Sequence, residues 1–156
     1  MVAPLNYSTK IAASKTVGEM QALLADHGAA RISVDYDGGA PCALHFMLLT
    51  PHGQRSFSLP VNVAAMEALL VAEDRAGRLR SGSKAERVSR AQAERVAWRV
   101  MKNWLEAQLA LVATQMVSVD EVFLPYLVLD HSSGRTLYES YREREQLALE
   151  AGRDES

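Results

Sequence analysis

The sequence predicts an α+β domain in which a three-stranded antiparallel β-meander packs against one long central helix, with short helices flanking both. Three observations predict this class. Apolar residues alternate with period two over residues 31–59, they repeat with the helical period of 3.6 before and after this stretch, and Ser/Thr-x-x-Glu/Gln capping boxes stand where helical repeats begin. With 156 residues, 48% of them hydrophobic, the chain has the size of a single domain, which we place at residues 1–156.

The first predicted helix begins at Thr16, because Thr16 and Glu19 have the spacing of a capping box. Its apolar stripe consists of Val17, Met20, Leu23 and Leu24. His27 and Gly28 follow this stripe, and glycine just after a helix is a common stop signal. The sequence therefore predicts a short amphipathic helix that ends near His27.

The meander follows from the change of period. Alternating side chains over residues 31–37 predict a half-buried strand, and Gly38 and Gly39 predict a tight turn, since glycine adopts positive φ at little steric cost. Residues 42–50 predict a second strand with apolar side chains on both faces, which favours the central place in the sheet. After a turn, residues 55–59 predict the third strand and complete the meander.

A second helix and a linker are expected after the sheet. Pro60 ends the third strand, and Asn62 can cap the helix that follows. The apolar stripe of this helix, which should lie on the sheet, consists of Val63, Met66, Leu69 and Leu70. Residues 73–88 are rich in Arg, Gly and Ser and lack an apolar period, so we expect a mobile basic linker there.

The longest predicted helix begins at Ser89, which has Gln92 three residues later, and runs to about residue 115. Ser83 and Glu86 form an alternative, earlier start. Apolar residues occupy more than one face of this helix, which predicts the central helix of the domain. Trp104 is expected in the core. It shares a stripe with Val100, Met101 and Leu111.

The C-terminal part predicts a short helical turn, an edge strand and a last helix. A Ser-x-x-Glu box at Ser118 begins the turn, and residues 123–129 are expected to be extended, with Pro125 confining them to a sheet edge or bulge. A Thr-x-x-Glu box at Thr136 caps the last helix. The acidic end, at about residues 150–156, is expected to fray.

The motifs for catalysis and metal binding are few. A lone Cys42 excludes an internal disulfide and a thiolate zinc cluster, neither GxGxxG nor GxxxxGK[ST] occurs, and the four histidines have no ligand spacing. Asp35 and Asp37 leave one alternative open, a hydrolase or nuclease in which both carboxylates hold a divalent cation, although carboxylates beside a turn are more often solvated. We expect no enzymatic activity, no cofactor and no metal.

Membrane and secretory signals are also missing from the sequence. It has no window of 18 apolar residues, and its N-terminus lacks the apolar region of a signal peptide. The expected location is the cytoplasm, with no membrane partner.

The positive signal for function is a basic cluster. Residues 75–102 carry nine of the 17 Lys and Arg residues and two acidic ones, a local net charge of +7. Arg95, Arg99 and Lys102 fall on one face of the long predicted helix. The linker adds Arg75, Arg78, Arg80 and Lys84, and Trp98 stands beside the helical stripe.

These residues predict a nucleic-acid site in which the basic groups follow a phosphate backbone and Trp98 stacks on an unpaired base, so single-stranded DNA is favoured. The alternative carries equal weight: Arg and Lys solvate the outer face of an apolar helix, and Trp98 packs in the core or in an interface.

Self-association, as a dimer, is a further expectation. The long helix is apolar over more of its circumference than one small sheet covers, and residues 123–129 add apolar surface. The basic segment would also attract the acidic stretch from residue 120 onward, which carries nine acidic and four basic side chains, across a two-fold axis.

Several segments resemble a family of small uncharacterised proteins of bacteriophages and other mobile elements. They are NYSTKI, KTVGEMQALLADHGA, ISVDYD, ERVAWRVMKNWLEAQLALVATQMVSVDEVFLPY and GRTLYESY. The resemblance implies a phage origin and a bacterial host cytoplasm, and it implies no catalytic activity. The expected order of a meander and a helix is also similar to the core of single-strand annealing recombinases, which concerns the fold alone.

Together these arguments favour a non-enzymatic phage accessory protein that binds nucleic acid. The alternative is a protein-binding module or inhibitor that acts on a host defence or replication complex, in which residues 123–129 and the long helix supply the contact with a host or phage protein.

Overall fold

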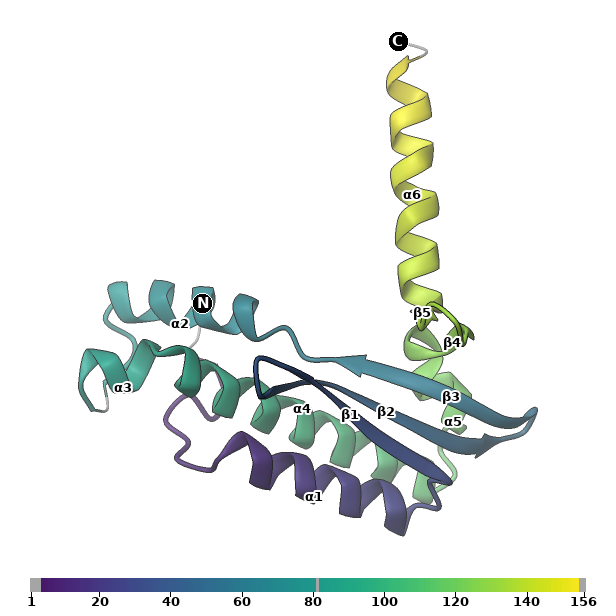
Figure 1. Ribbon diagram of the computed structural model, residues 1–156, viewed down its shortest axis with the longest axis horizontal. Helices are drawn as coiled ribbons and strands as arrows, with labels where there is room; N and C mark the ends of the chain where they lie inside the picture. Colours follow the sequence, from purple (N-terminus) through teal and green to yellow (C-terminus); the bar gives the residue numbers. More distant parts are fainter. Residues whose placement is uncertain (1–3, 81, 155–156) are drawn as a thin grey trace.

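The computed structural model describes residues 4–80 and 82–154 (Figure 1). Its elements are α1 (Ala13–Asp26), β1 (Arg31–Asp37), β2 (Ala40–Thr50), β3 (Gly53–Pro60), α2 (Val63–Arg75), α3 (Lys84–Val88), α4 (Arg90–Ala113), α5 (Val119–Phe123), the 3-10 turn η1 (Leu124–Tyr126), β4 (Val128–Asp130), β5 (Arg135–Thr136) and α6 (Leu137–Asp154). Strands β1, β2 and β3 form an antiparallel sheet in sequence order, and α1 and α4 lie along one of its faces (Figure 1). The predicted α+β class is confirmed.

The turn between β1 and β2 forms as the glycines predict. Gly38 and Gly39 have φ angles of 57° and 84°, the positive values that a two-residue hairpin turn of this kind requires. Beyond the turn, a β-bulge shifts the register, so that Tyr36 pairs with Pro41 whereas Asp35 pairs with Ala43. The bulge sets which side chains share a face of the sheet.

The core lies between one face of the sheet and the helices. The sheet contributes Leu44, Phe46, Leu48, Phe57 and Leu59. From α1 come Val17, Met20 and Leu24, which belong to the predicted stripe, and from α4 come Val96, Trp98, Leu105 and Leu109. The opposite face of the sheet is open and carries the exposed Ser33, Asp35 and Leu49.

The prediction for Trp104 is only partly met. Its side chain is half-buried and packs edge-on against Phe123 and Tyr126, with ring centroids 5.9 and 5.6 Å away. The fully buried indole of α4 is that of Trp98. The predicted stripe therefore lies at the margin of the buried face of α4 instead of at its centre.

Helix α1 begins earlier than the capping box predicts. Its first residue is Ala13, and Thr16 lies inside the helix, where its hydroxyl donates to the Ala12 carbonyl oxygen at 3.4 Å. A threonine hydroxyl can bond the carbonyl four residues back, so this residue fits a helix interior as well as a cap. The helix ends at the predicted position, with Gly28 at a φ of 87°.

Helix α2 has the predicted cap and a different neighbour. The Asn62 side chain accepts a hydrogen bond from the Ala65 amide at 2.9 Å, but the helix packs along α4 and not on the sheet. Val63 and Leu70 are its buried apolar residues. The prediction was wrong because the sheet face is already occupied by α1 and α4.

The segment expected as a mobile linker contains ordered elements on both sides of residue 81. Helix α2 extends to Arg75, Leu79 is buried, and α3 begins at Lys84 behind a complete capping box of Ser83 and Glu86. The alternative starts of the long helix are therefore both used, because Ser89 caps α4 separately by accepting from the Gln92 amide at 3.1 Å. One buried leucine, Leu79, does not make a helical or strand period in the sequence, which is why this segment was expected to be mobile.

The stretch expected as an edge strand, residues 123–129, is mostly not extended. Ser118 and Glu121 cap the short helix α5 as predicted, but η1 follows it directly, with Pro125 in its first turn, where the missing amide of proline is tolerated. The strand begins only at Val128 and pairs with β5. A single bridge between Leu127 and Phe57 ties this segment to the main sheet.

Helix α6 begins as predicted and continues further. Thr136 and Glu139 form the capping box, with amide-to-side-chain distances of 2.9 and 3.3 Å. The helix runs to Asp154, so residues 150–154 are helical instead of frayed, while the last two residues of the predicted tail lie outside the described residues. Across residues 4–80 and 82–154, no helix has the length and apolarity to cross a membrane.

Candidate functional site

The basic cluster of residues 75–102 is distributed over the end of α2, the α2–α3 segment, α3 and the first half of α4. Several of its members bind carboxylates. Arg78 holds the buried Glu73, with Nη2 3.0 Å from Oε1 and a second, shorter hydrogen bond from Nε. This donation by Arg78 keeps the pKa of Glu73 below its usual value, so the pair stays ionised.

Two further arginines join α2 to the helices that follow. Arg87 donates to the Asp74 carboxylate at 2.5 Å, and Arg90 donates to that of Glu67 at 3.1 Å. These contacts fasten α2 along α3 and the start of α4. A large part of the local positive charge is therefore neutralised inside the molecule.

Arg99 does not lie on a free surface. Its side chain is 10% exposed, and Nη1 donates to the Glu19 carboxylate of α1 at 2.7 Å. Within the described part of the chain, its Nε and Nη2 groups have no hydrogen-bond partner. The position of Arg99 does not favour the predicted phosphate contact, because α1 packs over this face of α4 and buries it.

Trp98 is also not available to a nucleic acid. The residue is fully buried, and its Nε1–H group donates to the Pro41 carbonyl oxygen of β2 at 3.1 Å. A base cannot stack on an indole that is enclosed by the core. The alternative expectation, Trp98 packed in the core, is the one that the structure confirms.

The remaining basic residues differ in accessibility. Arg95 donates to the Gln92 side-chain oxygen at 2.9 Å, and Lys102 pairs with Glu106 at 2.7 Å. Arg75, Arg80 and Lys84 are exposed and have no side-chain partner among residues 4–80 and 82–154. Of the eight residues of the predicted nucleic-acid site, these three therefore remain both exposed and unpaired within the described ranges.

A groove of about 670 Å³ crosses the open face of the sheet. The sheet lines it with Arg31, Ser33, His45 and Ser56, and the β4–β5 hairpin lines it with Val128 and His131. His45 Nε2 lies 2.7 Å from the Asp35 carboxylate, so an imidazole contacts one of the two carboxylates that the sequence singled out. No group of three or more potential metal ligands occurs among the residues described.

Sequence reasoning missed this groove, although a signal for it was present. The Gly38–Gly39 turn alone would place Ser33 opposite Leu44, a polar residue against an apolar one. The bulge beside Pro41 instead pairs Ser33 with His45 and Val34 with Leu44, so that apolar residues share the inner face. The mismatch between turn and apolar pattern was the available sign of the bulge.

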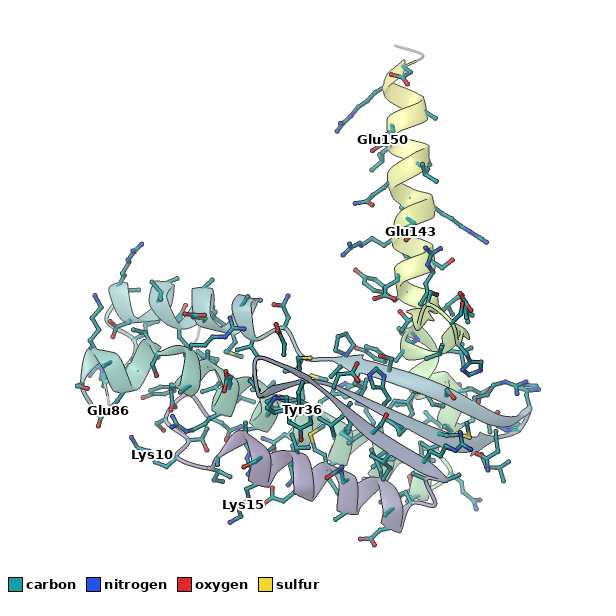
Figure 2. The ribbon with its side chains drawn as sticks, viewed as in Figure 1. Lys10, Lys15, Tyr36, Glu86, Glu143 and Glu150 are labelled. Carbon is teal, nitrogen blue, oxygen red and sulfur yellow. The ribbon has the colours of Figure 1, made fainter. Side chains whose placement is uncertain are left out.

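Helix α6 is the most exposed element of the fold. None of its 18 residues is buried, and the helix projects away from the sheet and the other helices (Figure 1). Glu143 and Glu150 stand on this projection, far from the other labelled side chains (Figure 2). Tyr138, Tyr141 and Leu149 are 52%, 58% and 65% exposed. An amphipathic helix thus presents its apolar side chains to solvent.

Comparisons with protein-family models, with curated proteins and with solved structures found no match to this chain. The resemblance to bacteriophage and mobile-element proteins therefore stays a prediction. The function has to be argued from the surfaces of the molecule itself.

Proposed function

We propose that this chain is a protein-interaction module that binds its partner through α6. The observation that carries the proposal is an 18-residue helix with no buried residue of its own. An isolated helix of this length is only marginally stable in water, because helical stability in proteins comes mainly from packing of an amphipathic face. A partner that covers the apolar face would supply that packing.

The two faces of α6 differ in chemistry. The first, which we call the front, carries Tyr138, Tyr141, Glu145, Ala148 and Leu149 at helical spacings of three and four. The opposite face, which we call the back, carries Glu139, Glu143, Glu150 and Asp154, with the exposed Leu147 among them. A mostly acidic back keeps a projecting helix soluble, and a front on which two tyrosines and Leu149 surround one carboxylate, Glu145, offers the aromatic side chains that are enriched in contact surfaces.

Site-specific photo-cross-linking in the cells that naturally make this protein tests the proposal. A photoreactive residue replaces Leu149 on the front in one variant and its neighbour Glu150 on the back in a matched control. Because the two positions stand at the same level of the helix, they differ only in the face they probe. We expect a discrete protein adduct from position 149 and none from 150. Absence of adducts at both positions, or equal labelling at both, would refute the proposal.

A second candidate function, nucleic-acid binding, is supported by the exposed Arg75, Arg80 and Lys84. They belong to the α2–α3 end of the molecule, away from α6 (Figures 1 and 2). Their unpaired charges could contact the phosphates of a single strand, where each contact releases a counterion.

Fluorescence anisotropy with a labelled single-stranded oligonucleotide at two salt concentrations tests this second function. Reversing all three charges should flatten the slope of log affinity against log salt by about two units, as the loss of three single-strand phosphate contacts requires. The matched control reverses Arg142, Arg144 and Arg153 on α6. No binding by the unaltered protein at about 50 mM salt would exclude the nucleic-acid function.

A further inference from the structure

We infer that β1 pairs antiparallel with β1 of a second copy of this chain, which joins two three-stranded sheets into one. The inference goes beyond the interaction module because it concerns a different surface. Helix α6 follows the hairpin at the β3 edge of the sheet, whereas β1 forms the opposite edge (Figure 1). Three observations carry it: unpaired backbone groups along β1, a strand sequence whose charges complement themselves, and an exposed tyrosine.

The backbone of β1 is unpaired along one side. The Val61 amide bonds the Cys42 carbonyl oxygen at 2.9 Å, so the even-numbered residues of β2 face β3 and the odd-numbered ones face β1. Their partners in β1 are Arg31, Ser33 and Asp35. Ile32, Val34 and Tyr36 therefore turn their N–H and C=O groups away from β2, and no element beyond β2 bonds them in the described part of the chain.

The two edges of the sheet differ in their cover. At the β3 edge a bridge joins Phe57 to Leu127, just before β4. Strand β1 is seven residues long and contains no proline, and the extra residue of the bulge, Cys42, lies in β2. It therefore lacks the short length, the proline and the bulge that often protect an edge. A regular, uncovered edge of this kind can accept another strand.

The charges of β1 match those of an antiparallel second β1. With Val34 on the two-fold axis, Arg31 stands opposite the partner's Asp37, and the axis repeats this pair at the other end. Asp35 lies diagonal to the partner's Arg31, and its carboxylate is also contacted by His45 Nε2 at 2.7 Å. Charged side chains commonly keep an edge apart from other strands, but those of β1 attract a second copy.

The apolar side chains of β1 fit the same pairing. Tyr36 shares a face of the strand with the half-buried Ile32 and Val34, yet it is 63% exposed and stands apart from the labelled residues of α6 (Figure 2). In the pair its ring lies opposite the partner's Ile32, and the two Val34 side chains meet on the axis. The second copy thus covers apolar surface that one chain leaves exposed.

Other registers fit less well. A shift of the partner by two residues keeps every side chain on its face of the sheet. In one direction this shift sets Asp35 directly opposite the partner's Asp35, and like charges at that position are destabilising. In the other direction Ser33 meets Ser33, and Tyr36 falls opposite the partner's Ala30, before the strand begins. The register centred on Val34 is the one that pairs all seven residues of β1.

Cysteine pairing tests the register. In a Cys42→Ser background, which removes the one native thiol, Ser33→Cys and Asp35→Cys are made as separate variants. Mixed and oxidised with glutathione disulfide, they should form a linked dimer, because these opposite positions form a non-hydrogen-bonded pair with Cα atoms about 4.5 Å apart. Neither should cross-link alone, since identical positions stand diagonally, about 7 to 8 Å apart.

The matched control mixes Ser33→Cys with Gln54→Cys, an exposed position on β3, and should give no disulfide. Linked dimers from Ser33→Cys alone or from Asp35→Cys alone would show one of the shifted registers and overturn the one inferred. No disulfide from the mixture, or as much from the control, would overturn the pairing itself.

Charge exchange tests the contact without a covalent link. Arg31→Asp and Asp37→Arg each set like charges opposite each other at both ends of the pair, and each should raise the dissociation constant about tenfold or more. Mixing the two variants restores both opposite-charge pairs, so the mixture should associate as tightly as the unaltered protein. Arg55→Asp on β3 is the control and should leave association unchanged. Failure of the mixture to recover would overturn the inference, because a defect of folding is not repaired by mixing.

Light scattering on the unaltered chain measures the association itself. At about 100 µM the mass should approach twice 17.1 kDa. A monomer mass would overturn the pairing through β1 and leave the α6 module standing, since the photo-cross-linking at position 149 probes another surface. A dimer that Arg31→Asp does not weaken would place the contact elsewhere and overturn the inference as well.

Discussion

Trp98 and Trp104 lie six residues apart on α4, and the fold buries their side chains to different degrees. The indole of Trp98 is fully enclosed and hydrogen-bonded to Pro41 of β2, whereas Trp104 is half-buried against Phe123 and Tyr126. Burial decides how much each ring stabilises the fold, because a truncated side chain loses its transfer free energy and leaves a cavity where the surroundings cannot close in.

We therefore expect Trp98→Ala to lower the free energy of unfolding by about 3 to 5 kcal/mol, and Trp104→Ala to lower it by less. Urea denaturation followed by circular dichroism measures both. Trp98→Phe is a useful intermediate, since it retains much of the ring volume but leaves the Pro41 carbonyl without its donor. An equal or larger loss at Trp104 would show that α4 is rotated relative to the sheet.

Arg99 is the residue whose interpretation changes most. On a solvated stripe its reversal would leave the fold intact, but α1 covers it and Glu19 binds it. Glu19→Gln removes the charge that pairs with Arg99 and should lower the free energy of unfolding by about 1 to 2 kcal/mol. This is the lower part of the range for a buried group that loses its partner, because solvent screens the partly exposed Glu19. The matched control is Glu106→Gln, which removes the exposed acid of the Lys102 pair and should change stability by at most about 1 kcal/mol. Equal effects would contradict the buried role of Arg99.

Asp130 gives a pH-dependent prediction in the β4–β5 hairpin. Hydrogen bonds from the Ser132 hydroxyl and amide stabilise its carboxylate and lower its pKa to about 2. Because the folded pKa lies below the unfolded value of 3.8, these bonds stabilise the hairpin fully above pH 4, and their contribution is lost as the pH falls toward 2. An NMR titration of the Asp130 carboxyl carbon should show this low pKa, and Ser132→Ala should raise it. A titration near 3.8 in the unaltered protein would contradict the hairpin geometry.

At the scale of elements, local signals predict helix ends well where a side chain can bond a free amide. The boxes at Ser118 and Thr136 form as expected, and Ser83 and Ser89 each cap a helix of their own. The box at Thr16 fails because the same hydroxyl is satisfied inside a helix. Local signals did not predict which elements pack together. Helix α2 has an apolar stripe suited to a sheet, but it lies on α4.

Helix α6 gives the element-scale prediction. A chain that ends after Ser140 retains the Thr136–Glu139 box and the hydrogen bond from the Leu137 amide to the Leu127 carbonyl oxygen. Since α6 buries no residue, this truncation should remove helical signal while leaving the melting temperature unchanged within about 2 °C at low micromolar concentration. Circular dichroism measures both quantities. A large fall in melting temperature would show that α6 packs against its own domain.

At the scale of the whole molecule, one core connects segments far apart in the chain. Phe46 of β2, Phe57 of β3 and Phe123 of α5 form a cluster with ring centroids 5.3 to 5.7 Å apart. This cluster ties the C-terminal elements to the sheet. The arrangement should make the domain unfold as one cooperative unit.

Two probes test that cooperativity. Urea transitions followed by far-ultraviolet circular dichroism and by tryptophan fluorescence should coincide, and Phe123→Ala should shift both together by about 3 to 5 kcal/mol. Separate transitions would mean that residues 118–136 form an independent unit. A shift confined to one probe would lead to the same conclusion.

The sequence by itself determined the meander, its Gly38–Gly39 turn and most helix starts. These depend on interactions between residues close in the chain, such as alternation, positive φ and capping. Only the tertiary structure decided which residues of the basic cluster are accessible to a ligand. The accessibility of Trp98 and Arg99 depends on α1 and β2, which are distant in sequence, and their helical spacing is the same whether that face is covered or free. Tertiary packing also left the front of α6 uncovered, because burial is a property of neighbouring elements and not of a local pattern.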